Sequence, residues 1–258
     1  AAATGLPTGL PVVAGCTDGT ASLLASGASC AGEWNSTLGT TLAIRGVSEK
    51  LIRDPEGRVY CHLHPDGLWL PGGAGNTGAG PLARVFGEEV LLSRSPEAAA
   101  RAPYDAIVYP LVGVGERLPL ARPAAEGFAT DEPRDMVSRL GAWMQGQALV
   151  ERWSYELCEE LGCEVGDWIA VTGGASRNDA WVQLRADVLG RQLRRPAHPS
   201  AAYGAALLAM AGATGAPVSR LSRELVRFEL ITDPAPGKTE VYSQLLERLQ
   251  SETRRRWG

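Results

Sequence analysis

Asp18 is a carboxylate that the sequence places where a ligand could bind. It stands in GCTDGTASLLASG, residues 15–27, where a short apolar run at 12–14 reads as the end of a buried strand and the segment after the glycine as a helix. A carboxylate at the start of a helix is held ionised by the positive end of the helix dipole. After a strand, such a carboxylate points out of the carboxyl end of the sheet, which is where open α/β sheets bind ligands. The alternative is that Asp18 only caps the helix, by accepting hydrogen bonds from free backbone N–H groups.

A glycine turn further along provides groups that bind anions. Residues 33–46, EWNSTLGTTLAIRG, contain two β-rich pieces on either side of Gly39, with Thr37 and Thr40 close to the turn. This pattern predicts a β-hairpin. Backbone amides and hydroxyls gathered around such a glycine bind phosphate oxygens. The alternative is a plain hairpin, because threonine favours strands in any case.

Residues 167–190 repeat the order of strand, glycine turn and helix. The apolar strand is followed by Gly173 and Gly174, and the next helix is capped near Asn178. The glycines let a ligand approach the backbone, and the N-terminus of the helix favours a phosphate or a nucleotide. Trp181, one turn into the helix, offers a flat apolar face for a base. An ordinary connection between strand and helix is the alternative.

Two other patterns suggest chemistry that their surroundings do not support. Gly73, Gly75 and Gly78 form a G-x-G-x-x-G sequence, but they follow three strands without a βαβ unit, so a glycine-lined turn facing the same cleft as Asp18 is favoured over a dinucleotide site. His62 and His64 lie on one face of a predicted strand. No third ligand follows at a suitable spacing, so no metal site is expected.

Strands and helices alternate through the rest of the chain. Strands are predicted at 58–63, 68–70 and from residue 104, and helices at 134–161, 201–213 and 238–256. The strand that starts at residue 104 enters a proline-rich loop. In that loop Glu116 and Arg117 either form an ion pair that fixes the loop or reach into the cleft.

Composition restricts the classes of function. The net charge of -4 gives no reason to expect nucleic acid, and no run of about 18 apolar residues predicts a membrane span. Five cysteines without a CxxC pair suit a reducing compartment, so a cytoplasmic location is expected. Because the chain starts without Met in a Pro/Gly-rich stretch, we expect it to be part of a longer protein.

Three motifs in one order resemble the FGGY family of carbohydrate kinases: GCTDGTASLLASG, NSTLGTTLAIRG, and VTGGASRNDAW followed by AAYGAALLA. YPLVGVGERLPLARP and residues 233–256 are similar to further segments of that family. The resemblance implies an α/β fold of the ribonuclease H-like, actin/hexokinase type, a mixed sheet flanked by helices. Two such domains would close on ATP and Mg²⁺. Residues 1–11 would be a linker from a missing N-terminal domain, and residues 12–258 the C-terminal, nucleotide-binding half.

The resemblance also assigns roles to individual residues. It places the catalytic base on Asp18, the phosphate-binding turn on Thr37, Gly39 and Thr40, and the adenosine motif on Gly173, Gly174, Asn178 and Trp181. No metal ligand is assigned. These assignments fit phosphoryl transfer, in which the protein mainly positions groups and the base accepts the hydroxyl proton late.

The implied function is ATP-dependent phosphorylation of a sugar hydroxyl. Within the family, TDGTASLLASGA and LGTT look most like the plant and cyanobacterial D-ribulose kinases. Specificity like that of xylulokinase or glycerol kinase, and a non-catalytic actin-like nucleotide-binding module, are alternatives. The expected partners are a small sugar and the chain's own N-terminal domain, with a homodimer left open. Because that domain would carry most sugar contacts, the isolated chain is expected to be inactive.

Overall fold

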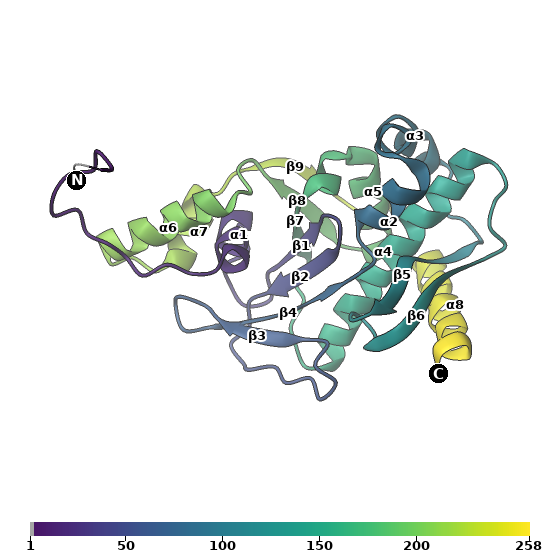
Figure 1. The fold of residues 1–258 in the computed structure, drawn as a ribbon, viewed down its shortest axis with the longest axis horizontal. Helices are drawn as coiled ribbons and strands as arrows, with labels where there is room; N and C mark the ends of the chain where they lie inside the picture. Colours follow the sequence, from purple (N-terminus) through teal and green to yellow (C-terminus); the bar gives the residue numbers. More distant parts are fainter. Residues whose placement is uncertain (1–2) are drawn as a thin grey trace.

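The computed structural model describes residues 3–258, and a seven-stranded sheet forms its centre (Figure 1). The strands follow the order β3-β4-β2-β1-β7-β8-β9 across the sheet. Their bounds are β1 (Trp34–Leu38), β2 (Leu42–Gly46), β3 (Tyr60–Leu63), β4 (Trp69–Gly75), β7 (Trp168–Thr172), β8 (Gln192–Pro196) and β9 (Phe228–Thr232). β1, β7 and β8 are parallel, whereas the other neighbours pair antiparallel. The predicted mixed sheet is therefore confirmed.

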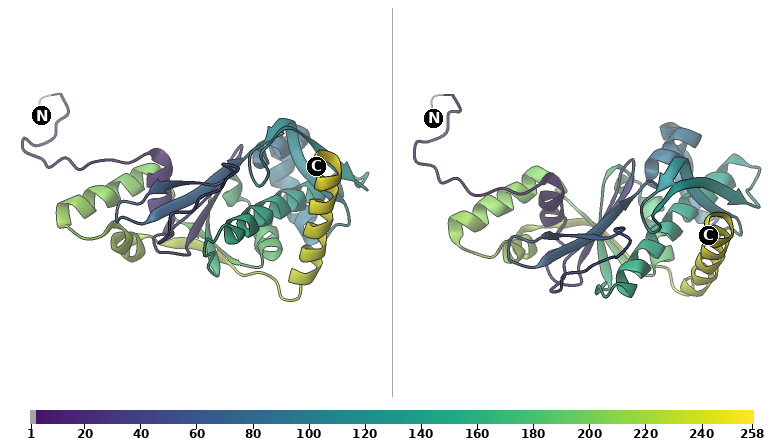
Figure 2. Two further views of the ribbon diagram at one scale, coloured as in Figure 1. Left: turned by 90° about the horizontal axis from the view of Figure 1, so that it is seen from below. Right: turned by 60° about the horizontal axis from the view of Figure 1, so that its bottom comes forward.

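Helices cover both faces of this sheet. They are α1 (Asp18–Ser26), α2 (Ala79–Phe86), α3 (Glu88–Ala100), α4 (Met136–Glu160), η1 (Gly174–Arg177), α5 (Asp179–Leu189), α6 (Ala201–Thr214), α7 (Val218–Leu225) and α8 (Thr239–Trp257). Figure 2 shows α1, α6 and α7 on one face and α4 and α5 on the other. A separate hairpin of β5 (Ile107–Glu116) and β6 (Arg122–Thr130) packs beyond α4, next to α8.

The alternation of side chains along β1 places the main core on one face of the sheet. Trp34 and Leu38 are fully buried in the large hydrophobic cluster that includes residues of α4, α5 and α8. The ring of Trp34 meets that of Tyr155 of α4 edge to face, with ring centres 5.5 Å apart. Because successive residues of a strand point to opposite faces, Asn35 and Thr37 face the side on which α1 lies.

α1 and α6 approach each other closely because both consist largely of small residues. Gly204 of α6 lies against the backbone of Ala21, and a side-chain carbon at Gly204 would overlap the carbonyl group of Ala21. Ser222 of α7 donates a hydrogen bond of 2.8 Å to the carbonyl oxygen of Leu24. α1 is thereby fixed against its neighbours, and its first residue, Asp18, is fixed with it.

The expected strand at residues 12–14 is wrong. These residues have no strand partner, Val12 is 95% exposed, and regular structure begins only with α1. Asp18 therefore reaches the sheet from a helix packed on its face and does not follow a buried strand. The predicted hairpin at 33–46 is confirmed as β1 and β2. Among residues 3–258, no helix combines the length and apolar composition needed to cross a membrane.

Candidate functional site

Asp18 is the first residue of α1, and it is not the helix cap. Thr17 occupies the cap position, and its hydroxyl accepts a hydrogen bond of 3.4 Å from the N–H of Thr20. The Asp18 side chain is exposed, and its Oδ1 accepts from the N–H of Gly19 at 2.7 Å. The capping alternative for Asp18 is thus not supported. Its carboxylate lies at the positive end of α1, with a second oxygen free for a ligand.

The turn between β1 and β2 is held by the N-terminus of α2. The carbonyl oxygens of Gly39 and Thr40 accept from the N–H groups of Ala79 and Gly80 at 2.8 and 3.1 Å. In a planar trans peptide the N–H points opposite to the carbonyl. The N–H groups of Thr40 and Thr41 therefore point away from α2. The N–H of Gly39 itself donates to the Thr41 carbonyl at 3.1 Å, so this turn has fewer free amides than the sequence pattern suggested.

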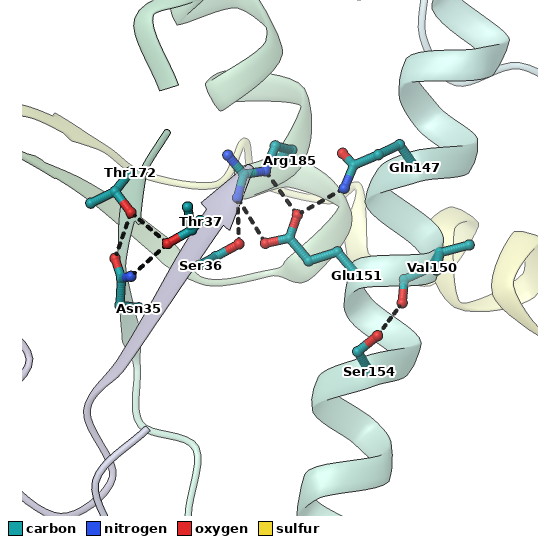
Figure 3. A network of polar contacts seen from close by, with 9 residues as sticks. All are labelled: Asn35, Ser36, Thr37, Gln147, Val150, Glu151, Ser154, Thr172 and Arg185. Carbon is teal, nitrogen blue, oxygen red and sulfur yellow. Dashed lines mark hydrogen bonds and ion pairs between the residues drawn. The ribbon is translucent and has the colours of Figure 1, made fainter. Parts of the chain in front are cut away.

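A small polar ring joins the ends of the parallel strands β1 and β7. Thr37 and Thr172 share a hydrogen bond of 2.8 Å between their hydroxyls (Figure 3). Asn35 donates to the Thr37 hydroxyl at 3.0 Å and accepts from the Thr172 hydroxyl at 3.2 Å. Thr37 is therefore positioned by two neighbours on the face that carries α1.

The opposite face of β1 contacts a buried ion pair. Arg185 of α5 and Glu151 of α4 are both fully buried and joined by two hydrogen bonds of 2.8 Å. Arg185 also donates to the Ser36 hydroxyl at 2.9 Å, as Figure 3 shows. Burying two charges is costly unless they are paired and hydrogen-bonded. This pairing links α4, α5 and β1 at one point.

The second glycine turn has the predicted form, and its two glycines differ. Gly173 has a φ of 85° and lies against the backbone of Leu38, whereas a side-chain carbon at Gly174 would meet nothing within 4 Å. Asn178 caps α5: it accepts from the N–H of Trp181 at 3.1 Å and donates to the Leu91 carbonyl at 3.3 Å. Gly174 is thus the position at which a ligand can approach this turn.

Three hollows lie along these elements. The Trp181 hollow, about 630 Å³, is lined by residues that include Thr40, Gly80, Leu91, Gly174, Asn178 and Trp181. The central hollow, about 750 Å³, is lined by residues that include Thr37, Thr172, Gly173, Gly174, Arg177 and Arg195. The Asp18 hollow, about 220 Å³, is lined by residues that include Asp18, Asn35, Thr37, Ala43, Arg45 and Tyr60.

These hollows adjoin one another, and together they are called the groove. Gly174 and Arg177 line both the Trp181 hollow and the central hollow, and Ser22 and Thr37 line both the central hollow and the Asp18 hollow. Every residue predicted for the site therefore borders this groove, with Asp18 at one end and the Asn178 turn at the other. Arg195 keeps the central part in place, because it donates to the Ser176 carbonyl at 2.5 Å and to Asp179 at 2.6 Å.

Trp181 differs from its prediction in one respect. Its side chain is only 2% exposed, since it packs into the main core cluster with Leu91 and Val182. It does not present a broad flat face to a base. The indole ring borders the Trp181 hollow and sets its depth, while the apolar residues Ala83 and Leu91 supply further wall.

The competing patterns have structural explanations. Gly73 and Gly75 lie within β4, which is antiparallel to both of its neighbours, so the dinucleotide alternative is wrong. His64 is buried, and its Nδ1 accepts from the N–H of Asp66 at 3.0 Å. Across residues 3–258 no group of three or more His, Cys, Asp or Glu side chains is arranged to hold a metal ion.

Glu116 fixes its loop by hydrogen bonds and makes no ion pair with Arg117. Its carboxylate is buried and accepts from the N–H groups of Asn76 and Arg117 at 2.7 and 2.8 Å. Burial raises the pKa of Glu116, although these backbone hydrogen bonds act in the opposite direction. Arg117 instead contacts the Asn76 side chain. Neither residue lines the Asp18 hollow, the central hollow or the Trp181 hollow.

The part of the chain that matches a known family includes the predicted residues of the groove. Residues 8–213, which contain Asp18 and both glycine turns, match the FGGY family of carbohydrate kinases, C-terminal domain. The chain belongs to the FGGY family. The mixed sheet between helices is accordingly the actin/hexokinase-like ATPase fold that was predicted.

Individual relatives from this FGGY family cover most of the chain. A gluconokinase of Bacillus licheniformis is 29% identical over 81% of this chain and 44% of its own length. A xylulose kinase of Bacillus subtilis is 28% identical over 82% of this chain and 44% of its own length. The crystal structure of xylulose kinase from Rhodospirillum rubrum superposes with a TM-score of 0.85 at 28% identity, covering 98% of this chain and 53% of that one. The chain thus spans about half the length of the relatives it matches.

Sequence reasoning missed several residues of the groove. Ala43 and Arg45 line the Asp18 hollow because β2 pairs with β1 in the register Thr37 to Ala43 and Asn35 to Arg45. The predicted hairpin around Gly39 already contained this register, so the alternation along β2 was the signal. Gly80 and Leu91 line the Trp181 hollow because α2 and α3 pack next to the hairpin. No local sequence pattern predicts that packing.

Proposed function

We propose that this chain is the half of an ATP-dependent carbohydrate kinase that binds adenosine and supplies the general base. The observation that supports this most is the row of adjoining hollows that runs from Asp18 past Thr37 to the Asn178 turn. A groove with a mainly apolar hollow at one end and a carboxylate at the other suits a nucleotide whose phosphates point towards an acceptor hydroxyl.

The nucleotide fits the residues that are present. Adenosine would occupy the Trp181 hollow beside Ala83 and Leu91, and Gly174 would let the phosphate chain pass close to the backbone. The outward N–H groups of Thr40 and Thr41 would donate to phosphate oxygens. These groups act by positioning, which is the main task in phosphoryl transfer.

Mg²⁺ would enter with the nucleotide. This ion usually keeps several waters and is held by one or two carboxylates together with substrate phosphates. Among residues 3–258, Asp18 is the carboxylate that borders the Asp18 hollow. The bound ion would neutralise phosphate charge.

Asp18 would accept the proton of the acceptor hydroxyl. The loose transition state leaves that proton on the acceptor until late, so an ordinary ionised carboxylate is a sufficient base. The opposite wall of the groove, which excludes water, would come from an N-terminal domain of the same protein, and the 258-residue chain alone would turn over no sugar.

Several sugars are candidates for the acceptor. The sequence motifs favour a pentulose such as D-ribulose, while relatives named gluconokinase and xylulose kinase add D-gluconate and D-xylulose as candidates. Specificity like that of glycerol kinase, and a non-catalytic nucleotide-binding module, are two further candidates. We also propose a cytoplasmic location. Whether two copies form a homodimer is left open.

The test is ADP release by the full-length protein with a panel of pentuloses, hexonates and polyols. We expect ATP-dependent turnover with at least one acceptor and loss of that turnover in Asp18→Asn. Binding of ADP without turnover on any acceptor would instead favour the non-catalytic module.

A further inference from the structure

Positions along β2 lie at different distances from the Gly39 turn, where the phosphates of the nucleotide would bind. Thr37 and Ala43 face each other next to the Gly39 turn, and Asn35 and Arg45 form the next pair on the same face. Two residues of a strand span about 7 Å. Arg45 therefore lies about 7 Å further from the Gly39 turn than Ala43, on the side away from the Trp181 hollow.

The Asp18 hollow reaches Arg45. Its lining there includes Tyr60, which is 46% exposed. Ala43, between Arg45 and the turn, is small. The hollow therefore continues from Asp18 along β2 as far as the guanidinium of Arg45.

The guanidinium of Arg45 has no direct side-chain partner among the described residues. Its side chain is half-buried, and within residues 3–258 it makes no ion pair or side-chain hydrogen bond. Its Nη1 lies 3.7 Å from the place that a side-chain carbon on Gly19 would occupy, directly after Asp18. Two other arginines border the groove: Arg195 is in contrast paired with both Asp179 and Glu229, and Arg177 lies between the central hollow and the Trp181 hollow, away from the Asp18 hollow.

We propose that Arg45 binds a carboxylate of the acceptor, so that the preferred acceptor is a sugar acid of the aldonate class. A guanidinium forms two parallel hydrogen bonds with a carboxylate, and such charge-assisted bonds are stronger in a half-buried site. In the proposed function the nucleotide phosphates would lie at the Gly39 turn and would not reach this charge. This inference rests on the proposed function and takes an aldonate in preference to the neutral pentulose.

In this proposal the γ-phosphoryl group passes from ATP to a hydroxyl of the acceptor. The acceptor oxygen forms a bond to the γ-phosphorus, the bond from that phosphorus to the β,γ-bridging oxygen breaks, and ADP leaves. The hydroxyl proton goes to the Asp18 carboxylate. Arg45 takes no part in bond making; it holds the carboxylate of the acceptor and so orients the reacting hydroxyl towards Asp18.

The experiment compares kcat/KM of the full-length protein for D-gluconate and for D-glucitol, which has the same carbon chain with CH₂OH in place of the carboxylate. We expect D-gluconate to be preferred on the order of 100-fold, the size of a charge-assisted pair. Arg45→Gln should remove this preference by raising KM for D-gluconate while KM for ATP stays the same. Arg45→Lys, which keeps the charge, should retain part of it. Arg53→Gln, an exposed arginine outside the groove, is the matched control.

The outcomes separate the two proposals. Turnover of D-ribulose, D-xylulose or glycerol with no preference for D-gluconate would overturn the role of Arg45 and leave the kinase proposal standing. Unchanged D-gluconate kinetics in Arg45→Gln would overturn it too. No turnover with any acceptor would reject the kinase proposal itself. If Arg45→Gln fails to fold, the ratio of the two acceptors in Arg45→Lys decides.

Discussion

Ser36 and Thr37 are neighbours on β1 whose hydroxyls contact different networks on opposite faces of the sheet. Ser36 accepts from Arg185 at 2.9 Å within the buried core, and Thr37 shares a bond of 2.8 Å with Thr172 beside the groove (Figure 3). β1 therefore contacts the Arg185–Glu151 pair on one face and the groove on the other. The stability of the core and the geometry of the groove depend on the same strand.

Glu151→Gln is expected to destabilise the protein by about 3–5 kcal/mol, because it leaves Arg185 buried without a compensating charge. Urea unfolding followed by circular dichroism measures the change. Glu156→Gln removes a more exposed ion pair with Arg152 on the same helix and should cost less than about 1 kcal/mol. Equal losses in the two variants would show that the buried pair has no special role.

Asp18→Asn in the full-length protein should reduce kcat by about 10²- to 10⁴-fold, the usual contribution of a general base. Since Thr17 caps α1, the substitution should leave the melting temperature nearly unchanged. Thr17→Ala is the complementary variant, with lowered stability and retained turnover. Near-normal kcat in Asp18→Asn would remove Asp18 from the mechanism.

Gly174→Val should abolish nucleotide binding without unfolding the protein, since a side chain there meets no protein atom and enters the groove. We expect the 258-residue chain to bind ADP with a Kd around the millimolar scale, about -4 kcal/mol. Amide shifts in an ADP titration report the loss. Gly173→Ala, in contrast, should lower stability, because Gly173 has a positive φ and touches Leu38. Shifts confined to regions away from residues 173–181 would mean that the nucleotide site is elsewhere.

Trp181→Ala should cost about 3–5 kcal/mol in unfolding free energy, because the indole is buried in the main core. Trp181→Phe keeps most of that packing and should cost much less. ADP affinity of the Phe variant, measured below its melting temperature, then isolates the contact with the nucleotide. If both variants unfold at the wild-type urea concentration, the burial of Trp181 has been misjudged.

Acidification should weaken the fold through His64. Burial lowers the pKa of His64 from its usual value of about 6.5, with the charge of Asp66 acting weakly in the opposite direction. A depressed pKa means that the neutral form is favoured in the folded state, so the stabilisation is complete above about pH 6.5 and is lost as the pH falls further. Urea unfolding at about pH 7.5 and about pH 5.5, on either side of that value, should show a larger loss for the wild type than for His64→Asn. The same loss in both would assign the pH effect to other groups.

Local patterns sufficed for the elements that carry the site. The Gly39 hairpin and the Asn178 cap each follow from residues within a few positions of one another, and both are present as predicted. Short apolar runs are less informative. Residues 12–14 look like a strand but have no neighbour to pair with, and strand formation requires one.

Tertiary contacts account for the rest. The burial of Trp181 depends on the contact between α3 and α5. The surroundings of Arg45 depend on the pairing of β2 with β4 and of β4 with β3. Neither contact is encoded within a window of neighbouring residues. The resemblance to a family supplied the roles of the residues, whereas the register of β1 and β2 supplied Arg45.

The close approach of Gly204 to Ala21 also defines where new specificities can be sought. Saturation libraries at Gly204 should contain almost no soluble variants, because every side chain there would push α1 away from α6. Ala43 and Tyr60 border the Asp18 hollow from the strands, opposite the residues of α1 that line it. Directed evolution towards larger acceptors should therefore randomise the sheet side of the hollow and keep the helix side constant.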